Sequence, residues 1–241
     1  MTALILARHY LRATFRSKLA TLINAIQPIM FLVLFGPLFA RSGIGSWDVL
    51  VPGLLMQLTL MSAGLAGFGI YVDRRFGAFE RLRVTPAGRT SLLLGRVLRD
   101  IVVLLVQAVL LLAIGFVLGL RVPPAGLLLG LVLLVVLAIG LASLSYAIAL
   151  VMPDELFPPV ATTAVVPLML LSGALLPMSL APAWLDVLSR FTPFRHVVEA
   201  VRAFFAGSYV TPVVGWGVLT GVLFLVVGVV VGTRLFHREN A

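Results

Sequence analysis

The chain of 241 residues contains no cysteine and a single lysine, and charged residues make up only 11% of it. The absence of cysteine excludes disulfides, thiolate catalysis and cysteine-ligated metal sites. The phosphate loop of ATPases needs the pattern G-x-x-x-x-G-K-[ST], and Lys18 stands in no such context. The histidines His9, His196 and His237 are isolated and lack metal-ligand spacing. We therefore expect no catalytic residue, no metal site and no cofactor in this chain, and no ATP hydrolysis by it alone.

Apolar residues are abundant instead and form 61% of the chain. No ordinary soluble class combines so many apolar residues with so few charges. The formal net charge is +9, but the basic residues lie mainly in short stretches beside hydrophobic runs, as the positive-inside rule expects. This pattern is typical of a polytopic membrane protein and does not favour nucleic-acid binding.

The hydrophobic runs predict the number of spans. A transmembrane helix needs about 20 mostly apolar residues, and six segments fit: 19–40, 49–71, 101–120, 125–152, 156–176 and 213–233. Residues 1–18 place arginines on one side of a helical wheel and apolar residues on the other, which predicts an amphipathic interfacial helix; a charged entrance to the first span is the alternative. The predicted fold class is an all-α membrane protein with six transmembrane helices in one domain, residues 1–241.

The distribution of basic residues predicts the orientation. With the N-terminus inside, six spans return the C-terminus to the inside. Thirteen of the 18 arginine and lysine residues then lie on the inner side and five on the outer side. The positive-inside rule therefore favours cytoplasmic N- and C-termini.

The largest polar segment, residues 72–100, stands between two spans and carries seven arginines. Within it, residues 73–84 predict a helix with an apolar ridge of Phe76, Phe79 and Leu82, and Pro86 stops that helix. An apolar ridge bordered by charge is typical of a helix that docks in a partner's groove; packing against the chain's own N-terminal helix is the alternative. The predicted coupling residues are Phe76, Gly77, Phe79, Glu80, Arg81, Leu82, Thr85 and Pro86.

Residues 177–211, between the fifth and sixth spans, predict two short outer helices that are re-entrant or interfacial. Pro182 begins the first, which runs to 190, and Thr192 and Pro193 form an N-cap and N1 pair for the second, 193–205. Three charges in the second helix argue against a seventh span. The candidate outer-gate residues are Pro177, Trp184, Pro193, Arg195, Glu199 and Arg202.

The interiors of the predicted spans contain no ionisable residue, which argues against a channel or an ion-coupled carrier. Energy for uphill transport then has to come from a separate subunit at a cytoplasmic surface. Polar uncharged side chains in the spans either line a path for an amphiphile or make ordinary interhelical hydrogen bonds. We favour hydrogen bonding residue by residue, except for Asn24, Gln27 and Gln57, whose amides need partners in hydrocarbon. The pathway candidates are Asn24, Gln27, Gln57, Thr59, Ser62, Thr162, Thr163 and Ser172.

Two segments carry a family resemblance. Residues 76–98, FGAFERLRVTPAGRTSLLLGRVL, resemble the cytoplasmic segment of ABC-2 type transporter permeases, and the VPGLL of 51–55 matches the start of that family's second span. Residues 171–207 are similar to the family's late signature, of serine-glycine, a proline, P-x-W, a T-P pair and an arginine. The matching residues are Ser172, Gly173, Pro177, Pro182, Trp184, Thr192, Pro193 and Arg202. Arg195 departs from the usual pattern by adding a charge to the outer helix.

The resemblance covers nearly the whole chain and is strongest to the daunorubicin-resistance type of drug exporter. It implies a bacterial cytoplasmic-membrane permease, as a homodimer or a paired permease, bound to two nucleotide-binding ATPase subunits that hold ATP and Mg. The implied activity is export of a hydrophobic or amphiphilic drug or natural-product antibiotic, along a path lined by spans one, two and five and in contact with membrane lipid. Export of lipid or polysaccharide precursors is the alternative within this class. A membrane scaffold or sensor coupled to an ATPase is the alternative from another class.

Overall fold

The computed structural model describes residues 26–27, 29–34, 36–37, 47–76, 89–175 and 178–238. Every regular element in these ranges is a helix. The elements are α3 (Trp47–Gly64), α4 (Phe68–Arg75), α6 (Arg89–Val117), α7 (Pro124–Val151), α8 (Phe157–Leu171), η1 (Met178–Leu180), α9 (Ala183–Arg190), α10 (Pro193–Phe205) and α11 (Pro212–Arg238). The described part of residues 26–37 is also helical. The predicted interfacial helix, residues 1–18, lies outside the described residues.

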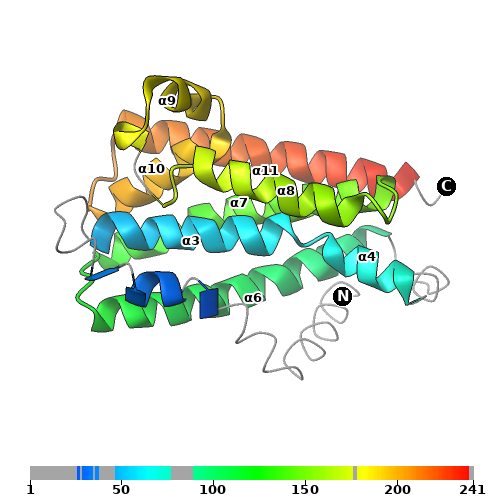
Figure 1. The fold of residues 1–241 in the computed structure, drawn as a ribbon, viewed down its shortest axis with the longest axis horizontal. Helices are drawn as coiled ribbons and strands as arrows, with labels where there is room; N and C mark the ends of the chain where they lie inside the picture. The colour runs from blue at the N-terminus through cyan, green and yellow to red at the C-terminus, as the bar shows by residue number, and fades with distance from the viewer. Residues whose placement is uncertain are drawn as a thin grey trace.

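The long helices lie side by side and alternate in direction, so that the bundle has two distinct ends (Figure 1). At one end lie α4, the turn between α7 and α8, and the C-terminal end of α11. We call this the α4 end. At the other end lie η1, α9 and α10, and we call this the α9 end.

Four helical segments are long and apolar enough to cross a membrane: Trp47–Arg75, Leu93–Val117, Pro124–Val151 and Pro212–Leu235. Three of these overlap the predicted spans 49–71, 125–152 and 213–233 with similar bounds, whereas Leu93–Val117 begins eight residues before the predicted 101–120. The helix predicted at 156–176 is shorter in the structure, because α8 has only 15 residues. At 1.5 Å per residue it is about 22 Å long, less than the roughly 30 Å hydrocarbon core. Of the first predicted span, 19–40, only parts of 26–37 are described, so four spans and one shorter apolar helix stand where sequence predicts six spans.

The membrane-spanning segment formed by α3 and α4 is interrupted between Gly64 and Phe68. Ser145 of α7 bridges the break: the Gly67 N–H donates to Ser145 Oγ (2.9 Å), and that hydroxyl donates to the Gly64 carbonyl (2.7 Å). A Cβ at Gly67 would lie 2.6 Å from the ring of Phe157, so only glycine allows this close approach. A break in a membrane helix is tolerated where a neighbouring helix satisfies the freed backbone groups.

The α7 helix is central to the packing and contacts α3, α6, α8, α10 and α11. Its closest neighbour is α11, where a Cβ added at Gly228 would lie 2.8 Å from the Cα of Gly140. Glycines at such a crossing let two backbones touch, which is how van der Waals packing holds helices together in lipid. The wide faces that stay exposed on α11 are apolar, as lipid contact requires.

The α10 helix begins at Pro193 in the N1 position, after Thr192 at the N-cap, and Gly207 follows its end with a φ of +79°. These bounds coincide with those the sequence predicts for the second outer helix. Its apolar face, which includes Val197, Val201 and Phe205, is fully buried against α7 and α11. This burial fixes the position of its charged face, which turns toward α9.

Candidate functional site

The α4 end holds a network of charged side chains that joins three helices. Asp73, near the end of α4, forms an ion pair with Arg96 of α6, and the Arg96 side chain is only 5% exposed. The Arg96 guanidinium also lies 6.0 Å from the centre of the Tyr146 ring on α7. A buried charge is tolerated when it is paired and hydrogen-bonded, so these contacts hold α4, α6 and α7 in register.

Arg74, the next residue of α4, is bound to the end of α7. Its Nη2 donates to the Leu150 carbonyl (2.6 Å) and its Nη1 donates to the Ala149 carbonyl (3.1 Å). The same guanidinium lies 3.4 Å from the carboxylate of Asp154 in the following turn. The last carbonyls of a helix have no partner within the helix, and a basic side chain satisfies them favourably. Arg74 therefore caps α7 from a different helix.

A second buried group lies next to this one, centred on Asp100. Arg99 pairs with the Asp100 carboxylate (2.6 Å), and the Tyr146 hydroxyl donates a hydrogen bond to its other oxygen. Asp100 is 6% exposed and Tyr146 is fully buried. Arg96, Arg99 and Asp100 have i, i+3 and i+4 spacing and so lie on one face of α6. The interior of the bundle therefore contains charged side chains near this end. They lie there because α6 begins about three turns before the predicted span 101–120.

This charged group is what sequence reasoning missed. The prediction placed Asp73 and Asp100 at the edges of spans, assigned no role to Arg96 or Tyr146, and expected an interhelical hydrogen bond from Ser145, which the structure has. The spacing of the three charges on one helix face was a usable signal. The contacts of Tyr146 with Arg96 and Asp100, and the bonds from Arg74 to the end of α7, had no such signal, since they depend on how the helices pack.

The predicted coupling residues follow directly after α4. Phe76, at the end of α4, is 79% exposed. The sequence predicts that a helix begins near Asp73, whereas the structure has Asp73, Arg74 and Arg75 as the last turn of α4, held by the contacts above. The remaining coupling residues lie outside the described residues: Gly77, Phe79, Glu80, Arg81, Leu82, Thr85 and Pro86.

The pathway candidates fall into two groups. Thr162 and Thr163 are exposed on α8, and Gln27 is exposed as well. Gln57 and Thr59 are buried inside the bundle, where Thr59 donates to the Leu55 carbonyl. Two other candidates are also covered: Ser172 is buried and donates to the Met169 carbonyl, and Ser62 is half-buried. Asn24 lies outside the described residues. The structure therefore does not bring the seven described candidates together on one surface.

Among the buried amides, Gln57 on α3 and Gln107 on α6 each have a side-chain carbonyl oxygen without a hydrogen-bond partner among the described residues. An amide oxygen in a dry interior costs free energy unless it is satisfied. The prediction singled out Gln57 for this reason. Gln107, one helix away, has the same property.

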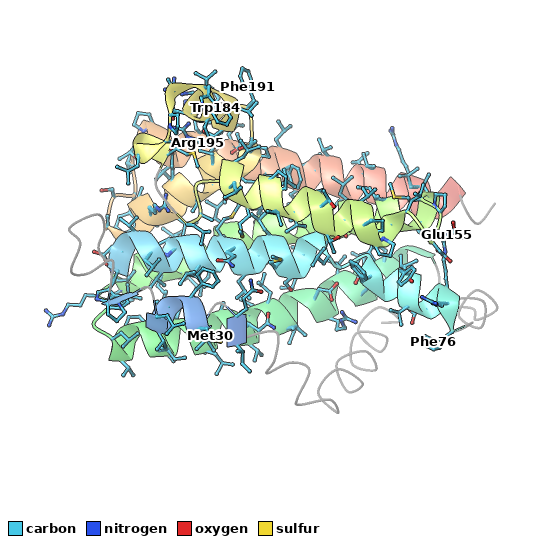
Figure 2. The ribbon with its side chains drawn as sticks, in the orientation of Figure 1. Met30, Phe76, Glu155, Trp184, Phe191 and Arg195 are labelled. Atoms are coloured by element: carbon cyan, nitrogen blue, oxygen red, sulfur yellow. The ribbon has the colours of Figure 1, made fainter. Side chains whose placement is uncertain are left out.

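At the α9 end, three of the six predicted outer-gate residues, Arg195, Glu199 and Arg202, line one cavity. Arg195 of α10 pairs with Asp186 of α9 (2.6 Å) and with Glu199 of its own helix (2.9 Å), and its Nη1 donates to the Ser189 hydroxyl (2.6 Å). Arg190 pairs with the same Asp186 carboxylate (2.6 Å). Figure 2 shows Arg195 beneath α9, with Trp184 and Phe191 projecting outward, at the opposite end of the bundle from Phe76 and Glu155.

The remaining gate candidates are placed separately. Trp184 is 68% exposed on the outer face of α9, and Pro193 is the first residue of α10. Pro177 lies outside the described residues.

Arg202, also on α10, binds backbone rather than carboxylates. Its Nε donates to the Val49 carbonyl (3.2 Å), and its Nη2 donates to the carbonyls of Gly173 (2.8 Å) and Ala174 (3.2 Å). These bonds connect α10 to the first turn of α3 and to the segment after α8. A cation at the carbonyl end of a helix is favourable because that end carries partial negative charge.

Burial and pairing shift the pKa values of these groups. Hydrogen bonds from Arg190 and then Arg195 lower the pKa of Asp186. Burial opposes the charge on Arg195, but its bonds to Glu199 and Asp186 outweigh this and raise its pKa. For Arg202, burial dominates and lowers the pKa to about 10, although Glu199 partly offsets it. All three groups therefore stay charged near neutral pH.

A cavity of about 640 Å³ opens at this end, between η1, α9, α10 and the start of α3. Its charged lining consists of Asp186, Arg190, Arg195, Glu199 and Arg202. Val49 and Met178 contribute apolar wall. Five of the nine lining residues are charged, and the cavity is large enough for a small ligand or a lipid headgroup.

Four long apolar helices and two charged ends define a multi-pass helical membrane protein. Residues 2–206 match the family model described as ABC-2 type transporter, and this match covers most of the chain. The chain belongs to the ABC-2 type transporter family. Members of this family normally work with an ATP-binding subunit.

Similar proteins include permeases from plastids and from bacteria. The chain is 29% identical to the putative transport permease ycf38 of Cyanophora paradoxa, over 78% of this chain and 69% of the relative. It is 24% identical to the daunorubicin resistance ABC transporter permease protein DrrB1 of Streptomyces coeruleorubidus, over 88% of this chain and 76% of the relative. It is 26% identical to the probable doxorubicin resistance ABC transporter permease protein DrrC of Mycobacterium tuberculosis, over 87% of this chain and 79% of the relative. The chain spans about two thirds of the length of the ycf38 relatives.

Proposed function

We propose that this chain is the membrane-spanning permease subunit of an ATP-driven exporter, and that it moves a hydrophobic or amphiphilic compound, such as a drug or a natural-product antibiotic, out of the cytoplasm or the inner leaflet. Membership of the ABC-2 family supports the transport role. The names of the relatives linked to daunorubicin and doxorubicin resistance support the substrate class. The chain works in a bacterial cytoplasmic membrane with both termini inside, paired with a second copy of itself or a related permease.

Energy enters at the α4 end. Two copies of a nucleotide-binding subunit bind ATP and Mg there, and their docking surface on this chain is the coupling segment that begins at Phe76. The observation that carries this proposal is the attachment of α4 to two further helices, through Asp73 to Arg96 and through Arg74 to the last carbonyls of α7. A displacement of the coupling segment is therefore transmitted through α4 to α6 and α7, because these contacts connect the three helices. Conformational coupling between distant sites is carried by rigid, packed elements that can adopt two discrete arrangements.

The substrate path lies between the two permease copies, on a face that includes α8. Thr162 and Thr163 on that helix are exposed within the single chain. The Thr162 hydroxyl is already bonded to the Pro158 carbonyl (2.8 Å), so a weakly polar surface is presented without an unsatisfied donor. This is the surface chemistry that an amphiphile needs in order to slide past without binding tightly. The α9–α10 pair acts as the gate at the far end.

Disruption of the docking ridge tests the function. Phe79→Asp or Glu80→Arg abolishes co-purification of the ATPase subunit while membrane insertion stays intact, and ATP hydrolysis stimulated by substrate is lost in the reconstituted pair. Phe191→Asp is the matched control, because Phe191 is an exposed aromatic side chain at the opposite end of the bundle. Full recovery of the ATPase with the Phe79 and Glu80 variants would reject the docking surface. ATP hydrolysis without movement of any substrate would favour a scaffold or sensor instead.

A further inference from the structure

The cavity at the α9 end carries more positive than negative charge. Three arginines and two carboxylates line it. The lowered pKa of Asp186 keeps that carboxylate ionised well below neutral pH, and Arg202, with a pKa of about 10, stays protonated at pH 7. By formal charge, three arginines and two carboxylates leave the lining a surplus of one positive charge.

We assign the surplus charge to Arg202, because Arg190 and Arg195 hold the two carboxylates in ion pairs, whereas Glu199 acts on Arg202 only through space. Arg190 and Arg195 both contact Asp186, and Arg195 also contacts Glu199. The hydrogen bonds of Arg202 go to neutral carbonyl oxygens from its Nε and Nη2 atoms, and its Nη1 makes no hydrogen bond to the described part of the chain. Those carbonyl bonds hold the guanidinium plane in place before any ligand arrives. A fixed guanidinium next to an open cavity is pre-organised for an anion.

The chemistry of this arrangement favours a phosphate oxygen. Arginine binds phosphate through charge-assisted hydrogen bonds from a planar fork. A phosphodiester carries one negative charge, which balances the surplus of the lining. The apolar contribution of Val49 and Met178 to the wall suits a group that is attached to an aliphatic chain.

We propose that the cavity between η1, α9 and α10 binds one phosphate group, carried either by a phospholipid headgroup or by free phosphate, with Arg202 as the anchoring residue. Binding of an anion there also ties the outer helices to the first turn of α3, because Arg202 already contacts Val49. This site is independent of the transported substrate and of the ATPase docking surface.

The test changes the charge of the cavity without removing any of its contacts. Ala183 lines the cavity at the first position of α9. A glutamate at this position adds one negative charge, and a helix N-terminus accepts an acidic residue well. Ala183→Glu is therefore compared with Ala183→Gln, which has the same size and no charge. Val187→Glu places the same charge on an exposed position of α9 that does not line the cavity.

Two probes separate the two sources of phosphate. The full chain in a maltoside detergent is titrated calorimetrically with inorganic phosphate. In a second arm, phosphatidylglycerol retained by the chain is counted by native mass spectrometry, with the phosphate-free lipid digalactosyldiacylglycerol as the comparison. Ala183→Glu weakens binding in at least one arm by about tenfold, whereas Ala183→Gln and Val187→Glu stay within about twofold of the unchanged chain.

The outcomes decide both the site and its ligand. A loss confined to the calorimetric arm assigns free phosphate, and a loss confined to the lipid arm assigns the headgroup. Equal binding by Ala183→Glu and Ala183→Gln in both arms overturns the proposal. Equal retention of the phosphate-free lipid and phosphatidylglycerol, with no calorimetric signal from phosphate, overturns it as well.

Discussion

At the α4 end, side-chain pairs connect residues that are far apart in the chain: Asp73 with Arg96, Asp100 with Tyr146, and Arg74 with Asp154, at separations of 23, 46 and 80 positions. At the α9 end, the described ion pairs join residues at most nine positions apart, all on α9 and α10. The first arrangement ties together helices that cross the membrane. The second holds two short helices to each other.

The long-range link at the α9 end is of another kind. Arg202 reaches Val49, which is 153 positions away, but it binds a neutral carbonyl there. At the α4 end, ion pairs join Asp73 to Arg96 and Arg74 to Asp154 across different elements, whereas Arg202 at the α9 end has no ion pair with a carboxylate among the described residues. We infer that the α4 end transmits movement and that the α9 end receives an anion.

The different roles of the α4 end and the α9 end require that the two ends lie on opposite sides of the membrane. Phe76 is 79% exposed at the α4 end and Phe191 is 83% exposed at the α9 end. The chain has no cysteine, so Phe76→Cys and Phe191→Cys each introduce a unique thiol. We expect an impermeant maleimide to label only the Phe191 variant in intact cells and only the Phe76 variant in inverted vesicles.

The effect is all or none, and the unchanged chain provides a control with no background. Labelling of both variants from the same side would contradict this arrangement, because the two charged networks would then lie in one compartment. Reversed labelling would still place the two ends on opposite sides, but with the α9 end in the cytoplasm.

The second prediction concerns the matched charges at the α4 end. Asp100→Leu removes the acceptor of the buried Tyr146 hydroxyl and the partner of Arg99, and breaking a buried pair in this way costs about 3–5 kcal/mol of stability. Asp100→Asn keeps a hydrogen-bond acceptor and costs less. The measurement is the thermal unfolding of the purified chain in detergent.

Asp154→Asn is the control, since Asp154 is half exposed and its ion pair with Arg74 is long, at 3.4 Å. Such a pair contributes about 1 kcal/mol or less. If Asp100→Leu and Asp154→Asn unfold at the same temperature, the α4 end is not held by its buried group.

The third prediction concerns the tether at the α9 end. Arg202→Met removes the three hydrogen bonds to the Val49, Gly173 and Ala174 carbonyls and lowers stability by about 2 kcal/mol. Arg202→Lys keeps the charge but not the planar fork, so we expect its stability to lie between that of the unchanged chain and that of Arg202→Met. Thermal unfolding and protease sensitivity of the α9–α10 segment are the measurements, and Arg190→Gln, at an exposed position, is the near-neutral control. An unchanged protease pattern in Arg202→Met would show that α10 is held by its apolar face alone.

The sequence predicts the α9 end better than the α4 end, for a physical reason. Thr192, Pro193 and Gly207 are local signals, and a helix start or stop depends on the few residues around it. The stripe of Arg195, Glu199 and Arg202 follows from helical spacing alone. The ranges of α9 and α10 were therefore within reach of sequence reasoning, although the pairing of Asp186 with Arg195 was not.

The α4 end depends on packing between distant segments. Ser145 bridges the break before α4, and Tyr146 donates a hydrogen bond to Asp100. Nothing in the sequence around residue 145 indicates which partner either side chain has. A serine in an apolar helix has many possible partners, and only the crossing of α7 with α3 and α6 selects one. The length of α8 was also missed, because three prolines and a run of apolar residues allow a span of almost any length between 15 and 21 residues.

The smallest expected effect separates the two ends by pH. Arg190 and then Arg195 lower the pKa of Asp186 below its value of about 3.9 in an unfolded chain. A carboxylate with a lowered pKa contributes stability above the unfolded value, and this contribution is lost as the pH falls through the folded value. The α9–α10 pair should therefore keep its stability from pH 7 down to about pH 4 and lose this share of it below that. Asp186→Asn should lower the unfolding temperature slightly at pH 7, and the difference from the unchanged chain should shrink toward pH 3. A difference that stays constant over this range would mean that Asp186 acts through its shape and not through its charge, and the local ion pairs of the α9 end would then be dispensable.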